Sequence, residues 1–167
     1  ISLPNPVYIG DTLWAETAVT FPEIPSFAPE FFAIARTTDV SRTKQFRNGI
    51  TQLDEEGVIQ VLRDPDYGDQ APVLAAVGAL QFEVAKHRLE NEFGAPVEFS
   101  MTNYKVARRT DAESAPTLRA MQGVDVLARS DGTLLAVFES SYWLDRLIAE
   151  QPELTLDRLV AEGELRQ

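Results

Sequence analysis

Apolar and polar positions along this chain follow a helical period in some stretches and form short apolar runs in others. Residues 73–77 make one such run, which leads into Gly78, a residue that permits a tight strand-to-helix turn. Residues 80–93 then carry apolar side chains at the i, i+3, i+7 and i+11 spacing of a helix lying on a sheet: Phe82, Ala85, Leu89 and Phe93. This stretch predicts a strand, a turn and a helix that pack together.

The same pattern continues on both sides of it. Further apolar runs predict strands at residues 31–37, 58–62 and 97–101. Asp39 or Ser41 can cap a first helix that ends near Leu53, with Gly57 just beyond its end. The resulting order, strand-helix-strand-strand-helix-strand, predicts an α+β fold built on the ferredoxin-like βαββαβ plait.

The segment before the plait has a different character. Residues 1–26 hold one apolar run, at 7–13, followed by a proline-rich stretch, and a single strand is too little for a domain. They look like the last strand of a β-barrel followed by a linker. The sequence is therefore expected to be a fragment whose other barrel strands are missing.

The segment after the plait predicts a second, smaller α+β unit. Its strands are expected at 104–109, 124–128 and 134–138, its helices at 113–121 and, after a Ser140 or Ser141 cap, to about 149. Asp131-Gly132 gives a hairpin signal between the last two strands. We expect three parts: 1–26 as barrel end and linker, 27–102 as the plait, and 103–167 as the second unit sharing a core with it.

The composition restricts the possible partners. The chain has 167 residues and a formal net charge of -11, so its surface as a whole repels a nucleic-acid backbone, and any RNA contact needs a local basic patch. Cysteine is absent, which leaves no thiolate chemistry and fits a reducing cytoplasm. No apolar run approaches the roughly 20 residues that cross a bilayer, so no membrane partner is expected.

Three segments carry a family resemblance. Residues 21–30 read Phe-Pro-Glu-Ile-Pro-Ser-Phe-Ala-Pro-Glu, and residues 44–57 read Lys-Gln-Phe-x-x-Gly-x-x-Gln-Leu-x-Glu-Glu-Gly. Residues 78–89 read Gly-x-Leu-x-x-x-Val-x-x-x-Arg-Leu, an arrangement common in C-terminal domains of translational GTPases. Together the three resemble the bacterial release factor 3 family.

The resemblance implies the C-terminal ribosome-docking region of a translation-termination factor. Such a factor promotes departure of the release factor that reads the stop codon. Its partners would be the ribosomal small subunit, with its RNA and protein, and its own GTPase and barrel domains. The Gly-x-x-x-x-Gly-Lys-Ser/Thr phosphate loop does not occur in this sequence. We therefore expect a cytoplasmic, monomeric chain that is not an enzyme and holds no cofactor, with GTP and magnesium in a missing N-terminal domain.

Basic residues are the candidates for ribosome contact, because RNA phosphates are bound by cations. They lie on the first helix, the second helix and the strand after the plait: Arg42, Lys44 and Arg47; Lys86 and His87, beside Arg88; and Lys105, Arg108 and Arg109. Both helices of a plait pack on one sheet face, so the first two groups are expected to form one basic ridge. Ordinary solvated faces paired with nearby acids are the alternative. Arg109 stands where the family often has tryptophan, which puts the contacts of that strand in question.

Other chemistry has less support. His87 is the only histidine and has no cysteine or second histidine with which to form a zinc site or a nucleophilic pair, so a surface position is expected. The aspartates between Asp64 and Asp69 lack the spacing of a calcium loop and fit a solvated turn. The acidic run at residues 54–56 is either an exposed turn or the partner of a basic group from a neighbouring domain.

Two other function classes remain open. A free-standing ferredoxin-like domain that binds a small ligand and regulates a partner fits the plait but leaves the strand at 7–13 unexplained. A carboxylate hydrolase has only scattered acids behind it. The aromatic residues at element positions are expected in the core rather than on a binding surface: Phe31, Phe32, Phe82, Phe93, Phe138 and Trp143.

Overall fold

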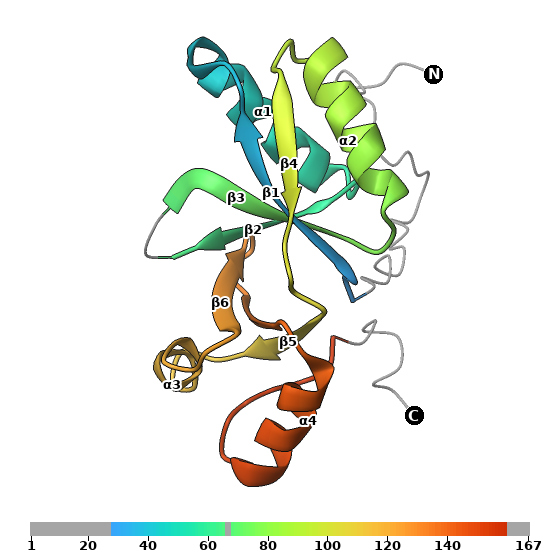
Figure 1. The fold of residues 1–167 in the computed structure, drawn as a ribbon. Helices are drawn as coiled ribbons and strands as arrows, with labels where there is room; N and C mark the ends of the chain where they lie inside the picture. Colours follow the sequence, from blue (N-terminus) through green and yellow to red (C-terminus); the bar gives the residue numbers. More distant parts are fainter. Residues whose placement is uncertain (1–27, 66–67, 160–167) are drawn as a thin grey trace, which may run out of the picture.

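The computed structural model describes residues 28–65 and 68–159. Within them the strands are β1 (Phe31–Thr37), β2 (Gln60–Asp64), β3 (Gly68–Ala76), β4 (Val97–Met101), β5 (Val106–Thr110), β6 (Val124–Arg129) and β7 (Leu134–Phe138). The helices are α1 (Thr43–Glu55), α2 (Leu80–Asn91), α3 (Ala115–Arg119) and α4 (Ser141–Glu150), with a 3₁₀ turn at Val40–Arg42 before α1. The strands form one antiparallel sheet in the order β4-β1-β3-β2-β6-β7-β5 (Figure 1).

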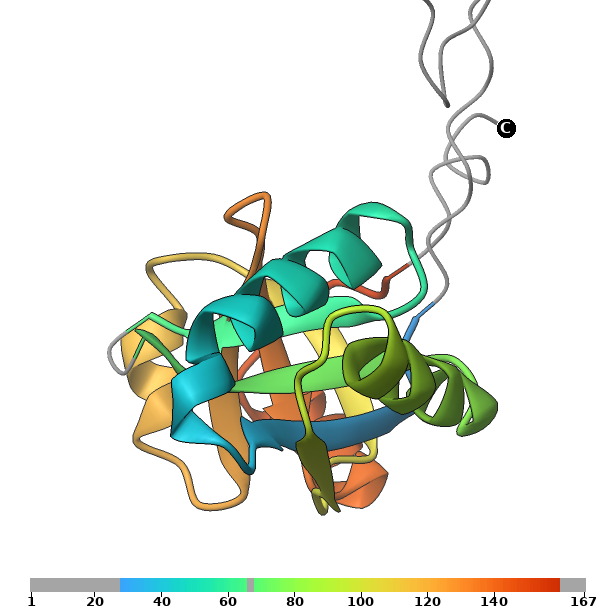
Figure 2. The same ribbon diagram turned by 90° about the horizontal axis from the view of Figure 1, so that it is seen from above.

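The first four strands form the predicted plait. Their order, β4-β1-β3-β2, is the order of a βαββαβ plait, and the predicted α+β fold class is confirmed. α1 and α2 lie side by side on one face of these strands (Figure 2), where α1 contacts β2 and α2 contacts β4. Phe46, Leu74 and Leu89 are almost completely buried in the core between this face and the two helices.

Local chemistry sets the ends of the plait helices. Asp39 Oδ1 accepts a hydrogen bond of 2.9 Å from the Ser41 amide and so caps the 3₁₀ turn that leads into α1. Gly57 and Gly94 follow α1 and α2 with φ of 72° and 61°, a left-handed conformation that glycine adopts without steric penalty. Both predicted helix ends are confirmed to within a turn.

The second half of the sheet carries α3 and α4 on its outer face. β6 and β7 form the predicted hairpin, with Gly132 at φ 86° and the Thr133 amide donating to Asp131 Oδ1 over 2.8 Å. Ala115 and Leu118 from α3 and Leu144 from α4 pack on the strands in a separate core. The predicted elements are all present, with the strand expected at 104–109 shifted to 106–110.

A third core lies between the two halves of the sheet. Phe32, Leu62 and Val73 project from the plait strands away from α1 and α2, and pack with Leu127 and Leu135 from the second half. Because side chains alternate along strands, each half thus has one face on this central core and the other under its own helices. The described residues form four layers: α1 and α2, the plait strands, β6-β7-β5, and α3 with α4.

The expectation of a buried position is wrong for two aromatic residues. Trp143 is 59% exposed and Phe31 is 36% exposed, whereas Phe32, Phe82 and Phe138 are buried as expected. In α4 the inward position is taken by the neighbouring Leu144, so Trp143 turns outward. The strand and linker expected in residues 1–26 lie outside the described residues, and the division into domains at 102/103 stays a prediction.

Candidate functional site

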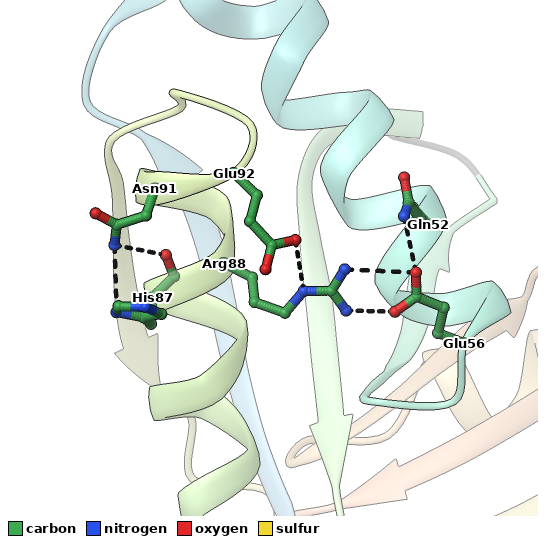
Figure 3. Close-up of polar contacts among 6 residues, drawn as sticks. All are labelled: Gln52, Glu56, His87, Arg88, Asn91 and Glu92. Carbon is green, nitrogen blue, oxygen red and sulfur yellow. Dashed lines mark hydrogen bonds and ion pairs between the residues drawn. The ribbon is translucent and has the colours of Figure 1, made fainter.

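The interface between α1 and α2 is organised around Gly49 and Arg88. Gly49 is buried, and a side chain there would meet Leu89 and Phe93 of the α2 region, so glycine allows the helices their close approach. Arg88 reaches from α2 to the end of α1 (Figure 3): its guanidinium donates to both carboxylate oxygens of Glu56 and, through Nε, to Glu92 Oε2 over 2.8 Å.

The charges in this cluster stabilise one another. Hydrogen bonds from Arg88 first, and then from Gln52 at 2.8 Å, hold the pKa of Glu56 below its usual range. Glu56 first and then Glu92 raise the pKa of Arg88. The acidic run at residues 54–56 is therefore not only an exposed turn, because Glu56 binds a basic group. That group comes from α2 of the same plait and not from a neighbouring domain.

The cations of α1 and of the 3₁₀ turn before it are exposed. Arg42, Lys44 and Arg47 form no ion pair with any other residue in the described ranges. Gly49 faces α2. Arg47 lies two positions earlier, so its side chain is rotated by about 200° around the helix axis from that of Gly49. Arg47 therefore occupies the flank of α1 opposite to α2.

The same flank of α1 faces the β6–β7 turn. Asp54 lies seven residues after Arg47 and so shares its stripe on the helix. Asp54 accepts hydrogen bonds from the Ser130 hydroxyl in that turn and from the Val61 amide of β2, the latter at 2.9 Å. Arg47 therefore lies on the side of α1 where the two halves of the molecule meet.

The α2 cations lie on the opposite flank of the helix pair. Arg88 faces α1, and Lys86, two positions earlier, is about 200° around the helix from it. Lys86 forms an ion pair with Glu90 at 3.9 Å. His87 is exposed, as expected, and its carbonyl and Nδ1 accept from Asn91 Nδ2 at 2.8 and 3.2 Å on the side away from α1 (Figure 3). The fold thus brings both groups to one sheet face but separates them by the Arg88–Glu56 contact.

The cations of β5 lie at the other end of the sheet from the plait. Arg109 is exposed and pairs with Asp157 at 3.2 Å, while Lys105 is exposed just before the strand. Arg108 is partly buried on the α3–α4 side, and burial first, together with the charge of Arg158, lowers its pKa. The eight candidate residues therefore form three separate groups, on α1, α2 and β5.

Two basic residues near the α1 flank were not among the sequence candidates. Arg63 Nη1 donates to Ser130 Oγ over 3.3 Å, and Arg129 is the residue paired with Leu62 across the β2–β6 junction. Their proximity to the Arg47 flank depends on the pairing of β2 with β6. That pairing joins segments more than sixty residues apart and has no local sequence signal.

Comparison with known proteins identifies the family. The profile of the family described as "Class II release factor RF3, C-terminal domain" matches residues 21–148, which is more than three quarters of the chain. The chain belongs to this family. The match includes both halves of the sheet and all three groups of candidate cations, so the predicted resemblance is confirmed.

Curated relatives agree with this assignment. The chain is similar to "Peptide chain release factor 3" of Symbiobacterium thermophilum, with 39% identity over 162 residues, 96% of this chain and 30% of that protein. Proteins of the same name from Synechocystis sp. and Nostoc punctiforme are 37% and 34% identical over 95% of this chain. The chain spans about 30% of the length of these relatives.

Two further findings concern only the described part of the chain. No helix there is long and apolar enough to cross a membrane. No group of three or more histidine, cysteine, aspartate or glutamate side chains is arranged there to hold a metal ion.

Proposed function

We propose that this chain is the ribosome-docking region of a release factor 3-type translational GTPase. In this proposal it holds the factor on the small ribosomal subunit in the cytoplasm while the factor promotes dissociation of the stop-codon-reading release factor. The match to the RF3 C-terminal domain supports the assignment to translation termination. The docking role is supported by Lys44 and Arg47, exposed cations of α1 that form no ion pair within the described residues.

The α1 group is the best of the three for RNA contact. Lys86 and Arg109 already pair with Glu90 and Asp157, so phosphate would have to displace those acids. Lys44 and Arg47 need no such exchange, whereas Arg42 lies close enough to Asp39 for its charge to help lower the pKa of that carboxyl group. Since RNA binding by cations releases counterions, a contact through this group would weaken as salt concentration rises.

GTP and magnesium belong, in this proposal, to a GTPase domain of the parent protein. The sequence lacks a phosphate loop, and we propose that this chain neither binds nor hydrolyses GTP by itself. Its other contacts would be with the GTPase and barrel domains of the same parent. We propose that it acts as a monomer. The alternative of a free-standing regulatory domain gains no support from the family match.

Charge reversal on α1 tests the docking role. We expect Lys44→Glu combined with Arg47→Glu in the intact factor to weaken ribosome binding about tenfold or more, because two phosphate contacts become repulsive. Binding to purified ribosomes is measured by sedimentation at several salt concentrations. The variant should also show a shallower salt dependence, since fewer counterions are released.

A matched control reverses two cations outside the candidate groups. Arg36→Glu combined with Arg158→Glu changes the net charge equally at exposed positions on β1 and in the segment after α4. Equal affinities of both double variants and the parent factor would exclude α1 as a docking element. An equal loss of ribosome affinity in both double variants would indicate a general effect of net charge and not a specific contact.

A further inference from the structure

A pocket beside α4 lies on the far side of the molecule from the candidate cations of α1 and α2. It has a volume of about 700 Å³, within the range of ligand-binding pockets. Its lining includes Met121, Val124, Phe138, Glu139, Trp143 and Leu147. In Figure 1, α4 is at the bottom of the view and the α1–α2 pair is at the top. This α4 pocket is therefore not part of the proposed α1 docking site.

Trp143 at the rim of the α4 pocket is available for contact. It is 59% exposed, and the adjacent Tyr142 is 69% exposed. The α4 residues Tyr142 and Trp143 meet edge to face at 6.4 Å. Tryptophan is enriched in the binding hot spots of protein interfaces, because contact removes its large apolar surface from water. An exposed tryptophan beside an apolar depression is therefore typical of such a hot spot.

The charges around the α4 pocket are predominantly acidic. Arg146 is neutralised by Glu150, whose Oε1 accepts from Arg146 Nε at 2.6 Å. The Glu139 carboxylate has no hydrogen bond or ion pair to another residue of the described ranges. The remaining unneutralised charge at the pocket is therefore negative and complements a cationic partner.

Nucleic acid fits this pocket poorly. The unpaired carboxylate repels phosphates. The guanidinium of Arg146 lies over the Trp143 ring, 5.4 Å from its centroid, so one face of the ring is already covered and is not open to a stacked base. A polypeptide can meet both features, with an apolar side chain in the pocket and lysine or arginine beside Glu139.

We propose that the α4 pocket binds a basic polypeptide segment that inserts an apolar side chain beside Trp143. The apolar anchor contacts Val124, Phe138 and Leu147, and its flanking cations pair with Glu139. This inference does not rest on the docking role proposed for α1, because it uses different residues, on the opposite outer layer of the molecule.

Selection from a random 12-residue peptide library against the full chain tests the proposal. Selected peptides are titrated into the parent chain and into each variant, and binding is measured by isothermal titration calorimetry, because Trp143→Ala removes the tryptophan whose fluorescence would otherwise report on the pocket. We expect selected peptides to combine an apolar residue with lysine or arginine. Trp143→Ala should weaken their binding about tenfold or more, and Glu139→Lys should weaken it as well.

Ile148→Ala is the matched control, since Ile148 is an exposed apolar residue of α4 that does not line the α4 pocket. It should leave the peptide affinity unchanged, and circular dichroism checks that every variant is folded. The proposal is overturned if no peptide is enriched, if the selected peptides are acidic, or if Trp143→Ala leaves binding intact. The proposal would also be overturned if a 12-nucleotide single-stranded RNA bound at Trp143 more tightly than the selected peptides do. Formation of a dimer that depends on Trp143 would overturn it as well.

Discussion

Gly49 shows how one missing side chain sets the position of two helices. An added Cβ would lie 2.6 Å from Leu89 Cδ2 and 2.9 Å from the Phe93 ring, closer than these atoms approach without displacement. We expect Gly49→Ala to lower the free energy of unfolding by about 1–3 kcal/mol through overpacking. This loss would occur although alanine favours a helix by about 1 kcal/mol over glycine. Chemical denaturation measures the difference.

Gly78→Ala provides the matched control for that substitution. A Cβ added at Gly78 would have no neighbouring atom within 4 Å, and the φ of Gly78 is not in the left-handed region. Its replacement should change stability by no more than about 0.5 kcal/mol, as at other open surface sites. If Gly49→Ala were as stable as Gly78→Ala, the close approach of α1 and α2 would not depend on glycine. The turn at Gly78 therefore does not require glycine, contrary to the sequence expectation, whereas the packing at Gly49 does.

Asp111 joins the start of α3 to the segment after α4. Its Oδ1 accepts from the Ser114 amide at 2.8 Å, and Ser114 Oγ accepts from the Thr155 amide at 3.0 Å. Hydrogen bonds from the Thr155 side chain and then from Ser114 hold the pKa of Asp111 below its ordinary range. The folded state therefore favours the charged form of this carboxyl group.

This lowered pKa makes the Asp111 contacts sensitive to acid. A group whose pKa is lower in the folded protein contributes stability above its unfolded pKa, about 3.9 for aspartate, and loses it as pH falls further. We expect Asp111→Asn to lower the melting temperature at neutral pH and the difference from the parent chain to shrink below about pH 4. Melting curves from about pH 7 to about pH 2.5 cover this range. Glu113→Gln, a nearby exposed substitution, should show no such convergence.

Local patterns were enough to predict the individual elements. The Asp131-Gly132 signal lies in the observed hairpin, and the apolar stripe of residues 80–93 faces the core as helix α2. Contacts between elements were not predictable in the same way. Arg88 has a local partner in Glu92 at i+4, but its contact with Glu56, 32 residues away, depends on how the helices pack. The exposed position of Trp143 likewise depends on which face of α4 meets the strands.

The positions of the candidate cations relative to one another were likewise not predictable from local sequence patterns. Sequence reasoning placed Arg47 and Lys86 on helices that share a sheet face, and the structure agrees. It could not state that the helices turn these two residues to opposite flanks, because that requires knowing which side of each helix meets the other. The grouping of Arg63 with the β6–β7 turn follows from tertiary pairing alone.

The central core decides whether the chain behaves as one folding unit. β2 and β6 are joined by a short stretch of pairing, Leu62↔Arg129 and Arg63↔Ala128, which would hold the halves together weakly by itself. The side chains between the halves include Leu62 and Leu135, both with no exposed surface. Burial of these side chains against one another couples the stability of the plait to that of the second unit.

Leu135→Ala tests this coupling. We expect the substitution to lower the free energy of unfolding by about 2–5 kcal/mol, because it removes buried apolar atoms and leaves a cavity. Because the two halves share the core, unfolding followed by circular dichroism and by Trp143 fluorescence, in a Trp14→Phe background, should keep one common midpoint. Leu74→Ala in the core under α1 and α2, and Leu118→Ala in the core between α3, α4 and the strands, should lower that same midpoint for both probes. Separate midpoints would instead mean that residues 27–102 and 103–167 fold independently. The central core would then be an interface between two domains that are each stable alone.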